Sequence, residues 1–461
     1  MTPRRGPAVT VRRIGKVLVA NRGEIAVRVI RACREAGIAS VAVFSEADRE
    51  ALHVLAADEA YPIGPPPAAE SYLNVRSIVA AGETTECEAV HPGWGFLAEN
   101  PEFVRACEDN ELIFVGPDAD VMSRMGDKVE AKRELAEAAV PLVPGTEAVG
   151  GDDVRAAADD IGYPVLLKAS AGGGGKGMRA VAGPDELDAA FERASAEALA
   201  AFGDGSIYVE KLIAPARHVE IQVLCDADGG VLTLGERECS IQRRHQKLIE
   251  ESPSPALDEP TREAMETDVT RACRRIGYLN AGTFEFLLGP DGAYFFIELN
   301  ARLQVEHPVS ELVTGIDIVR EQLRIAAGGP LHVTGRASRR GHAIEVRINA
   351  EDPARGFAPS PGVIERFRPP LGPGIRLDTH VEEGSIIPPY YDSLLAKLIV
   401  WDEDRPAAIE RTMRALRELD VRGVATTRAV ALEILGSDEF RGGRYSTSFL
   451  DETRLAAVGV G

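Results

Sequence analysis

The sequence lacks any apolar run long enough to cross a membrane. A membrane-spanning helix needs about 20 consecutive apolar residues, and no stretch of this 461-residue chain approaches that length. The basic residues near the N-terminus are not followed by the apolar segment that a secretory signal requires. We therefore expect a soluble protein of the cytoplasm that is not bound to a membrane.

Closely spaced cysteines are also missing. The chain has six cysteines, and none forms a Cys-x-x-Cys pair. Their scatter argues against a structural zinc site and against a disulfide framework, and it fits a reducing compartment. The cysteines are Cys33, Cys87, Cys107, Cys225, Cys239 and Cys273.

Basic residues are fewer than acidic residues. The chain has 52 lysines and arginines against 72 acidic residues, which gives a formal net charge of −20. A surface of this sign repels nucleic acid and anionic membranes unless a local basic patch compensates, and no long basic run occurs. We therefore expect no nucleic-acid partner.

The length and the apolar fraction of 45% suggest about three domains. Residues 14–117 alternate short apolar strands with amphipathic helices, which predicts a parallel sheet covered by helices. Ligands of such sheets bind at the carboxyl ends of the strands. The strands are expected at 16–20, 41–44, 89–91 and 113–116, and a helix at 23–37.

Prolines and glycines set off residues 140–215 as a separate small unit. Strands are expected there at 164–168 and 178–181, and a helix near 185–201. Residues 216–330 are strand-rich and end in a helix, and residues 340–450 form a last α+β segment.

A glycine run occupies residues 170–177, between the two strands of the small unit. The run does not match the Walker A motif, because Gly177 follows Lys176 where that motif has serine or threonine. The run matches Gly-x-Gly-x-x-Gly, but a strand rather than a helix follows. A glycine-rich hairpin remains, which is either a flexible loop or a mobile lid over phosphates. We favour the lid, because four consecutive glycines cost too much entropy for a plain hairpin.

Two predicted strands carry carboxylates on either side of Asp291-Gly292, a favoured pair for a two-residue hairpin loop. Such a loop pairs Glu285 directly with Glu298, and Asn300 shares their face. Two like charges this close are destabilising unless a cation lies between them, and hard oxygen ligands suit Mg²⁺. A solvated strand face is the alternative, and this motif alone does not exclude it.

Polar residues continue at every second position after that strand. They would spread over about 26 Å if fully extended, so the chain must turn or only part of the run serves one ligand. Arginine is suited to hold a carboxylate or carbonate, and Glu306 is a candidate base. The run comprises Glu298, Asn300, Arg302, Gln304 and Glu306.

Two further clusters precede this hairpin. His218 and Glu220 alternate on one predicted strand face within residues 217–222. Residues 243–247 hold four cationic or imidazole groups, which is unusual in so acidic a chain. They form either an anion site or a salt-bridged surface.

Together these segments resemble biotin carboxylase over roughly residues 14–450. Each motif alone is weak, but the combination is highly specific. The matching segments are residues 21–25, 91–96, 125–128, 168–177, 217–222, 242–247, 282–286, 302–308, 347–352 and 390–393.

The resemblance implies an α/β and α+β multidomain protein of the ATP-grasp type, with the nucleotide held between the lid and the body. It implies an N-terminal parallel α/β, Rossmann-like domain at 12–127. An ATP-grasp domain follows at 128–330, with its glycine-rich lid at about 141–214. A C-terminal α+β domain is implied at 331–452.

The resemblance also implies the site residues. ATP would be bound by Lys128, Lys168, Gly173, Gly174, Gly175, Glu210, Lys211, Ile213, His218, Gln242 and His245. Mg²⁺ or Mn²⁺ would be bound by Glu285, Glu298 and Asn300. Bicarbonate would be held by Lys247, Arg302, Gln304 and the backbone of Val305.

The implied reaction is an ATP-dependent, ADP-forming ligation. Glu306 deprotonates bicarbonate, which attacks the γ-phosphate to give carboxyphosphate. Carboxyphosphate yields CO₂ and phosphate, the phosphate removes the N1′ proton of biotin, and Arg347 stabilises the enolate. Glu306, Arg347, Arg302 and Lys247 are thus the implied catalytic residues.

Two departures from the family pattern stand out. Trp94 replaces an expected tyrosine, for which we expect a small effect on the biotin-facing side. No Met-Lys dipeptide, the usual biotin attachment sequence, occurs, and the chain ends at Gly461, soon after the carboxylase-like region. We therefore expect the chain to work with a separate biotin carboxyl carrier protein and a separate carboxyltransferase subunit. By resemblance alone, we also expect a homodimer.

The expected role is the first half-reaction of an acyl-CoA carboxylase, as in acetyl-CoA carboxylase of fatty acid biosynthesis. The sequence leaves the final acceptor open among acetyl-CoA, propionyl-CoA and pyruvate, so a pyruvate carboxylase subunit is an alternative. Other ATP-grasp ligases are disfavoured by Arg347 and by the run from Arg302 to Glu306. A non-catalytic ATP-binding regulator is disfavoured because Glu306 and the metal ligands are retained.

Overall fold

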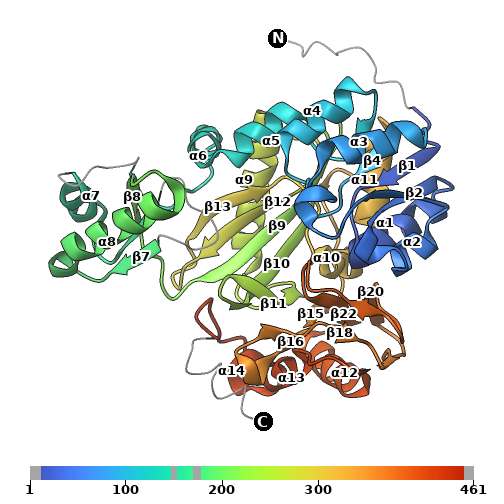
Figure 1. Cartoon of the computed structure of the whole chain (residues 1–461). Coiled ribbons are helices and arrows are strands. Elements are labelled where there is room, and N and C mark those ends of the chain that lie inside the picture. The colour runs from blue at the N-terminus through green and yellow to red at the C-terminus, as the bar shows by residue number, and fades with distance from the viewer. Residues whose placement is uncertain (1–11, 147–152, 170–177, 451–461) are drawn as a thin grey trace.

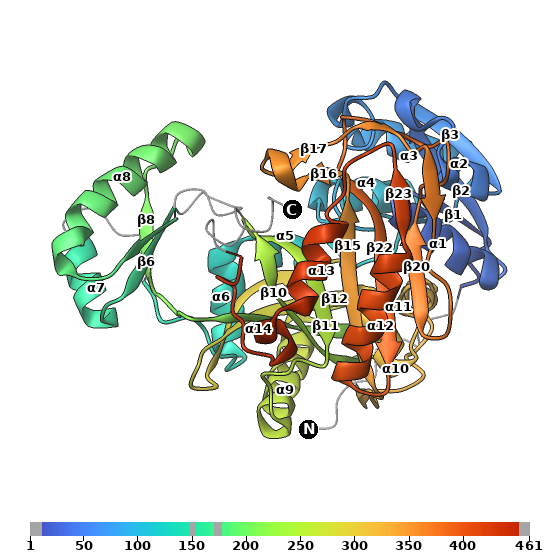
Figure 2. The same ribbon diagram turned by 90° about the horizontal axis from the view of Figure 1, so that it is seen from below.

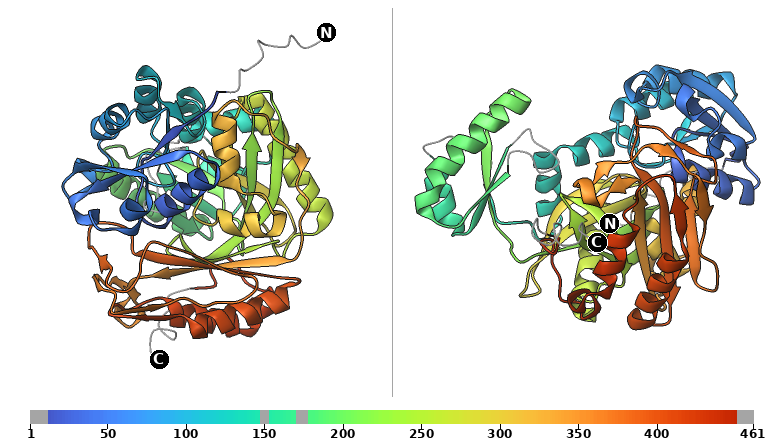
Figure 3. Two further views of the ribbon diagram at one scale, coloured as in Figure 1. Left: turned by 90° about the vertical axis from the view of Figure 1, so that its right-hand side faces the viewer. Right: turned by 60° about the horizontal axis from the view of Figure 1, so that its bottom comes forward.

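A computed structural model describes residues 12–146, 153–169 and 178–450. The chain folds into a body and a small unit, made of α7, β6, β7, α8 and β8, that projects from it (Figure 1). In the body, a parallel sheet near the N-terminus packs beside a larger central sheet, and helices near the C-terminus cover one end of the central sheet (Figure 3).

The N-terminal region is a five-stranded parallel sheet in the order β3-β2-β1-β4-β5, as the alternation of strands and helices predicted. Its strands are apolar because helices cover both faces. The predicted strand at 113–116 is only two residues long. The elements are β1 (Lys16–Val19), α1 (Gly23–Glu35), β2 (Ala39–Ser45), α2 (Leu52–Ala56), β3 (Glu59–Gly64), α3 (Val75–Thr84), β4 (Ala89–His91), α4 (Pro101–Asp109), β5 (Ile113–Phe114) and α5 (Ala119–Gly126).

Helix α6 (Lys128–Glu137) leads to the small unit, whose three antiparallel strands lie in the order β7-β6-β8. The unit has an apolar core of its own, which includes Val165, Leu167 and Val209. The strands around the glycine run are confirmed, but the run itself, with Gly173, Gly174 and Gly175, lies outside the described residues. The elements are α7 (Val154–Ile161), β6 (Val165–Ala169), β7 (Met178–Val181), α8 (Pro184–Phe202) and β8 (Ile207–Lys211); the sequence did not predict α7 or β8.

The central sheet has nine strands, in the order β13-β12-β9-β10-β11-β15-β22-β20, with β14 beside β10. It includes strands from both the predicted ATP-grasp domain and the predicted C-terminal domain, because β11 pairs with β15. Its strands are β9 (Arg217–Cys225), β10 (Val231–Arg243), β11 (Gln246–Ser252), β12 (Asn280–Leu288), β13 (Tyr294–Asn300), β14 (Gly335–Arg336), β15 (His342–Asn349), β20 (Ile375–Thr379) and β22 (Leu394–Asp402).

Helices cover this sheet over separate apolar cores. Helix α9 (Glu259–Ile276) packs against β9 and β10, whereas α12 (Arg405–Glu418) and α13 (Arg428–Gly436) pack against β15 and β22 (Figure 2). The remaining elements are α10 (His307–Thr314), α11 (Ile318–Ala326), β16 (Glu351–Asp352), β17 (Ala358–Pro359), β18 (Gly362–Val363), β19 (Arg366–Arg368), β21 (Ile386–Ile387), β23 (Asp420–Arg422) and α14 (Asp438–Arg441).

The hairpin of β12 and β13 corrects one prediction and confirms another. Its loop has three residues, not two, because the Gly289 amide bonds the Ala293 carbonyl at 2.7 Å and Gly292 is left-handed at φ 83°. That loop alone would misplace the carboxylates by one residue. Ile297 is an extra, bulged residue on β13, and it restores the pairing of Glu285 with Glu298.

A second bulge shapes the hairpin of β10 and β11. Between the pairs Gln242–Lys247 and Ile241–Ile249 the register shifts by one residue, so Leu248 is extra on β11. The bulge places Lys247 and Glu250 on the same face of the sheet, although they are three residues apart.

All six cysteines are buried and free. Across residues 12–146, 153–169 and 178–450, no helix combines the length and the apolarity needed to cross a membrane.

Candidate active site

A cavity of about 780 Å³ lies between the small unit and the strands β10 to β13 of the central sheet. It gathers most of the predicted site residues from segments far apart in the sequence. Those that line it are Lys128, Lys168, Glu210, Ile213, His218, Gln242, His245, Lys247, Glu285, Glu298, Asn300, Arg302, Gln304, Val305, Glu306 and Arg347.

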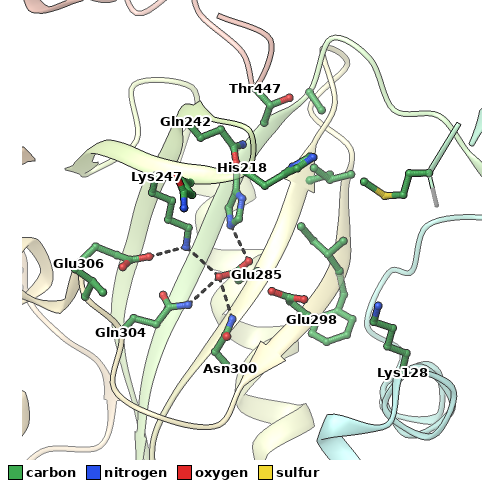
Figure 4. A pocket seen from close by; sticks show the side chains of 18 of the residues that line it. Lys128, His218, Gln242, Lys247, Glu285, Glu298, Asn300, Gln304, Glu306 and Thr447 are labelled. Atoms are coloured by element: carbon green, nitrogen blue, oxygen red, sulfur yellow. Dashed lines mark hydrogen bonds and ion pairs between the residues drawn. The ribbon is translucent and has the colours of Figure 1, made fainter. Parts of the chain in front are cut away.

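Lys247 lies in the cavity wall beside Glu285 and Glu306 (Figure 4), and Glu220 is a third carboxylate within ion-pair distance. Its Nζ is 2.6 Å from Glu220, 3.0 Å from Glu285 and 2.5 Å from Glu306. Burial alone would lower the pKa of the ammonium, but the three negative charges raise it well above its usual value. Lys247 is therefore a permanent cation.

His218 extends from β9 toward the same carboxylates. Its Nε2 lies 3.0 Å from a Glu285 oxygen and 3.7 Å from a Glu220 oxygen. Burial opposes the imidazolium, but Glu285 and Glu220 outweigh that effect and raise the pKa of His218 to about 9. The histidine is therefore charged at neutral pH, and with Lys247 it keeps the pKa of Glu285 well below its usual range.

Glu285 and Glu298 face each other across the β12–β13 hairpin, and Asn300 lies beside them (Figure 4). The Glu285 carboxylate accepts hydrogen bonds from Asn300 Nδ2 at 3.0 Å and from Gln304 Nε2 at 2.8 Å. Partial burial and the charge of Glu285 raise the pKa of Glu298. An oxygen-rich site whose second carboxylate is held at an energetic cost suits a hard divalent cation.

The run after β13 turns, which was one of the two alternatives, since β13 ends at Asn300 and α10 begins at His307. Arg302 donates to Glu99 at 2.8 Å and to the Asn300 amide oxygen at 2.9 Å. The Val305 carbonyl accepts a 2.9 Å hydrogen bond from Lys397, a completely buried lysine of β22. The turn therefore brings Arg302, Val305 and the carboxylates to one wall.

Arg347, on β15, forks between two carboxylates. Its guanidinium is 2.6 Å from a Glu250 oxygen and 2.9 Å from a Glu306 oxygen. Glu306 thus lies between Arg347 and Lys247, and these cations keep the pKa of its buried carboxyl below the usual value. Glu306 is a carboxylate at neutral pH and is able to accept a proton.

The small unit contributes the opposite wall. Lys168 on β6 pairs with Glu210 on β8 at 2.6 Å, and Lys132 of α6 bonds the other Glu210 oxygen. Lys211 points elsewhere, because its Nζ donates to the carbonyls of Gly162 and Tyr163 at 2.8 and 3.0 Å. The Lys211 side chain is not part of the cavity wall.

The turn between β10 and β11 holds His245 toward the cavity in an uncommon conformation. Arg244 and His245 are the two loop residues of this hairpin, and both are left-handed, at φ 49° and 66°. Residues with a Cβ adopt this conformation at a cost, and such strain gathers at functional sites.

Sequence reasoning missed several residues that support the site. Arg237 is fully buried and donates to Glu220 at 2.5 Å, to Gln222 at 2.7 Å and to Gln304 at 3.0 Å. It holds together residues of β9 and of the turn after β13. It lies between Glu236 and Glu238 on β10, and its partners are on other segments of the chain, so no local sequence pattern could have identified it. Glu99, Lys132, Glu250 and Lys397 were missed because their partners too are distant in the sequence.

Three family models match the chain. "Biotin carboxylase, N-terminal domain" matches residues 13–122, and "Biotin carboxylase C-terminal domain" matches residues 345–452. Between them, "Carbamoyl-phosphate synthase L chain, ATP binding domain" matches residues 127–334.

Curated relatives align over nearly the whole chain. A biotin carboxylase of a Nostoc species is 52% identical over 440 residues, which covers 95% of this chain and 98% of the relative. A pyruvate carboxylase subunit of Methanothermobacter thermautotrophicus is 51% identical over 442 residues, covering 95% of this chain and 90% of the relative.

Solved structures share the fold. The biotin carboxylase domain dimer of Hydrogenobacter thermophilus 2-oxoglutarate carboxylase, in complex with MgADP, ADP and bicarbonate, has a TM-score of 0.90 and 48% identity, covering 97% of this chain and 98% of that one. Biotin carboxylase of Campylobacter jejuni in a β,γ-ATP complex has a TM-score of 0.90 and 46% identity, covering 95% of this chain and 98% of that one.

Proposed function

The chain belongs to the biotin carboxylase family and is an ATP-dependent ligase that carboxylates biotin, and from this premise we propose how its residues divide the reaction. The observation that carries the proposal is the position of Glu306. It lies between Lys247 and Arg347 in the same cavity as the carboxylates Glu285 and Glu298. This position supports the role of Glu306 as the base, with an anion beside its two cations and a metal beside Glu285 and Glu298.

ATP is placed between the small unit and the central sheet. Glu285 and Glu298, with Asn300 beside them, would hold Mg²⁺, which would supply positive charge to the phosphoryl oxygens. Lys128, Lys168 and His245 would contact the phosphates, together with Gly173, Gly174 and Gly175. Glu210, Lys211, Ile213, His218 and Gln242 surround the rest of the nucleotide, Lys211 through its backbone.

Bicarbonate binds beside Glu306. Lys247, Arg302, Gln304 and the backbone of Val305 hold the anion, and Glu306 accepts its proton. The freed oxygen attacks the γ-phosphorus as the bond to ADP breaks, which forms carboxyphosphate. The exclusion of water protects this labile product.

Biotin is carboxylated in the second step. Carboxyphosphate releases CO₂ and phosphate, and the phosphate removes the N1′ proton of biotin. Arg347 then stabilises the negative charge on the biotin ureido oxygen, and the nitrogen attacks CO₂.

The chain works with other polypeptides in the cytoplasm, as part of a homodimer. Biotin is on a separate carrier protein, because the sequence offers no Met-Lys acceptor dipeptide. A carboxyltransferase then passes the carboxylate to an acyl-CoA. A 2-oxo acid is the second candidate acceptor, because a pyruvate carboxylase subunit matches this chain almost as well as a biotin carboxylase does.

The experiment measures ATP cleavage with bicarbonate, free biotin and Mg²⁺ each omitted in turn. We expect cleavage to require bicarbonate and Mg²⁺ and to be stimulated by biotin, with carboxybiotin as the product. Mass spectrometry after expression with a biotin ligase should find no covalent biotin on this chain. ATP cleavage that ignores bicarbonate, or covalently bound biotin, would overturn the proposal.

A further inference from the structure

Two glutamates with no role in the proposed reaction lie directly behind Arg347. Glu250 on β11 and Glu345 on β15 are opposite each other in the antiparallel register, and both are completely buried. Side chains directly opposite in such a pair have Cβ atoms about 5 Å apart. Arg347 is two residues beyond Glu345 on the same strand, so it shares their face.

The two carboxyl groups have very different surroundings. One oxygen of Glu250 accepts a hydrogen bond from Arg347 at 2.6 Å, and its other oxygen has no partner among the described residues. Neither oxygen of Glu345 has a hydrogen-bond partner within the part of the chain that the structure describes. Burial and the neighbouring Glu250 raise the pKa of Glu345 well above its usual value, so Glu345 is protonated at neutral pH.

A second cation near this pair is already engaged. Lys397 on β22 is opposite Arg347 in register, but its Nζ donates to the Val305 carbonyl at 2.9 Å and pairs with Glu24 at 3.1 Å. It therefore does not neutralise Glu345 by direct contact. Of the two carboxyls, only Glu250 has a cationic hydrogen-bond partner among the described residues, so a single negative charge on the pair is favoured on Glu250, beside Arg347.

We propose that Glu250 is a positioning residue for Arg347 and that Glu345 opposes it as a neutral, protonated carboxyl. The inference rests on the proposed role of Arg347 in biotin carboxylation. Arg347 has two carboxylate partners, Glu250 and Glu306. When Glu306 has taken the bicarbonate proton it becomes neutral, and its hold on the guanidinium weakens. The charge of Glu306 is one cause of the raised pKa of Glu250, so its loss favours the charged form of Glu250, which holds Arg347 toward the cavity for the second step.

The test compares two isosteric variants at facing positions. Glu250→Gln removes the charge that holds Arg347, whereas Glu345→Gln replaces a neutral carboxyl by a neutral amide. We expect Glu250→Gln to lower biotin carboxylation roughly ten-fold while bicarbonate-dependent ATP cleavage changes less than about two-fold. Glu345→Gln should leave both activities within about two-fold of the unmodified enzyme.

Three measurements make the outcome unambiguous. Thermal unfolding of both variants checks that the fold is kept. Infrared difference spectra of the unmodified enzyme against Glu345→Gln should show the C=O stretch of a protonated carboxyl. Arg347→Ala, measured in parallel, tests the proposed function separately, because it should show the same separation of the two activities.

Some results would overturn the inference. Equal loss of both activities in Glu250→Gln, no loss in either, or equal effects of the two variants would show that Glu250 does not act through Arg347. Absence of the protonated carboxyl signal would refute the neutral Glu345. If Arg347→Ala itself failed to separate the activities, the proposed role of Arg347 would fall instead.

Discussion

The two faces of strand β11 shift the pKa values of neighbouring glutamates in opposite directions. Glu250 and Glu251 are adjacent, and both are completely buried. Burial and the nearby Glu306 raise the pKa of Glu250 despite the opposing charge of Arg347. Burial pushes the pKa of Glu251 upward too, but its hydrogen-bond donors prevail and lower that pKa to about 2.

The difference lies in the supply of donors. The Glu251 carboxylate accepts hydrogen bonds from two nitrogens of Arg405, at 2.6 and 2.9 Å, and from the Tyr445 hydroxyl. His342 Nε2 lies 2.6 Å from the same carboxylate. On the other face, five carboxyls share four cations, which are His218, Arg237, Lys247 and Arg347. That face includes Glu220, Glu250, Glu285, Glu306 and Glu345. Full compensation favours stability, whereas under-compensation leaves carboxyls that can bind a proton or a metal.

The largest effect should come from removing the base on the under-compensated face. We expect Glu306→Gln to reduce bicarbonate-dependent ATP cleavage about 10³-fold, because general-base catalysis contributes roughly that factor. The melting temperature should change little, because the face loses a charge that it does not need for stability. Steady-state phosphate release and calorimetry measure the two. A Glu306→Gln variant with a much lower melting temperature and an unchanged turnover would contradict the proposed difference between the two faces.

The opposite result is expected on the compensated face. Glu251→Gln leaves Arg405 without its carboxylate, and breaking a buried ion pair costs about 3 kcal/mol of unfolding free energy. Turnover of the folded protein should stay within about two-fold. Urea unfolding and activity at low temperature measure this, and a stable but inactive variant would contradict it.

The same residue predicts a pH dependence. Its pKa is about 2 in the folded protein against an ordinary 4.5, so its contribution to stability is complete above pH 4.5 and disappears as the pH falls toward 2. Unfolding free energies measured across this window should fall less steeply in Glu251→Gln. Identical slopes in the two proteins would show that Glu251 is not responsible.

A somewhat smaller effect should separate the two steps of the reaction. Arg347→Ala should lower biotin carboxylation about 100-fold, because it removes a charged donor to the developing enolate. Bicarbonate-dependent ATP cleavage should keep most of its rate. Paired assays of carboxybiotin and ADP measure this, and an equal fall in both would make Arg347 a structural partner of Glu250 and Glu306.

The smallest effect should concern the metal. We expect Glu298→Gln to raise the Mg²⁺ concentration needed for half-maximal ATP cleavage about ten-fold, because one of two facing carboxylates is lost. Asp291→Asn, at the exposed tip of the same hairpin, is the matched control and should leave the requirement unchanged. A titration of ATP cleavage with Mg²⁺ measures this requirement. An unchanged rate at limiting Mg²⁺ would show that Glu298 is not a metal ligand.

Local sequence patterns predicted many of the strands and helices. They did not predict the roles of charged residues whose partners are distant in the sequence. The apolar strands of the parallel sheet and the strands around the glycine run follow from short-range periodicity. The pairing of Glu285 with Glu298 was right although its loop was wrong, because the bulge at Ile297 offsets the extra loop residue. Arg237 and Glu250 acquire their roles only when distant strands meet.

The continuity of the central sheet was also invisible in the sequence. Strand β15 belongs to the predicted C-terminal domain, which begins at residue 331, and it pairs with β11 of the predicted ATP-grasp domain. Nothing local in either strand specifies that partner, because edge-to-edge pairing depends on which strand is left unpaired after the rest of the sheet forms.

This pairing has a consequence for synthesis on the ribosome. Strand β11 ends at Ser252 and its neighbour β15 begins at His342, so about 90 residues separate them. At translation rates of roughly 5–20 residues per second, β11 has an open hydrogen-bonding edge for about 5–20 s. During that interval the nascent chain presents a strand edge to other chains. We therefore expect chains truncated before β15 to aggregate and to depend on chaperones in proportion to the time that this edge stays open.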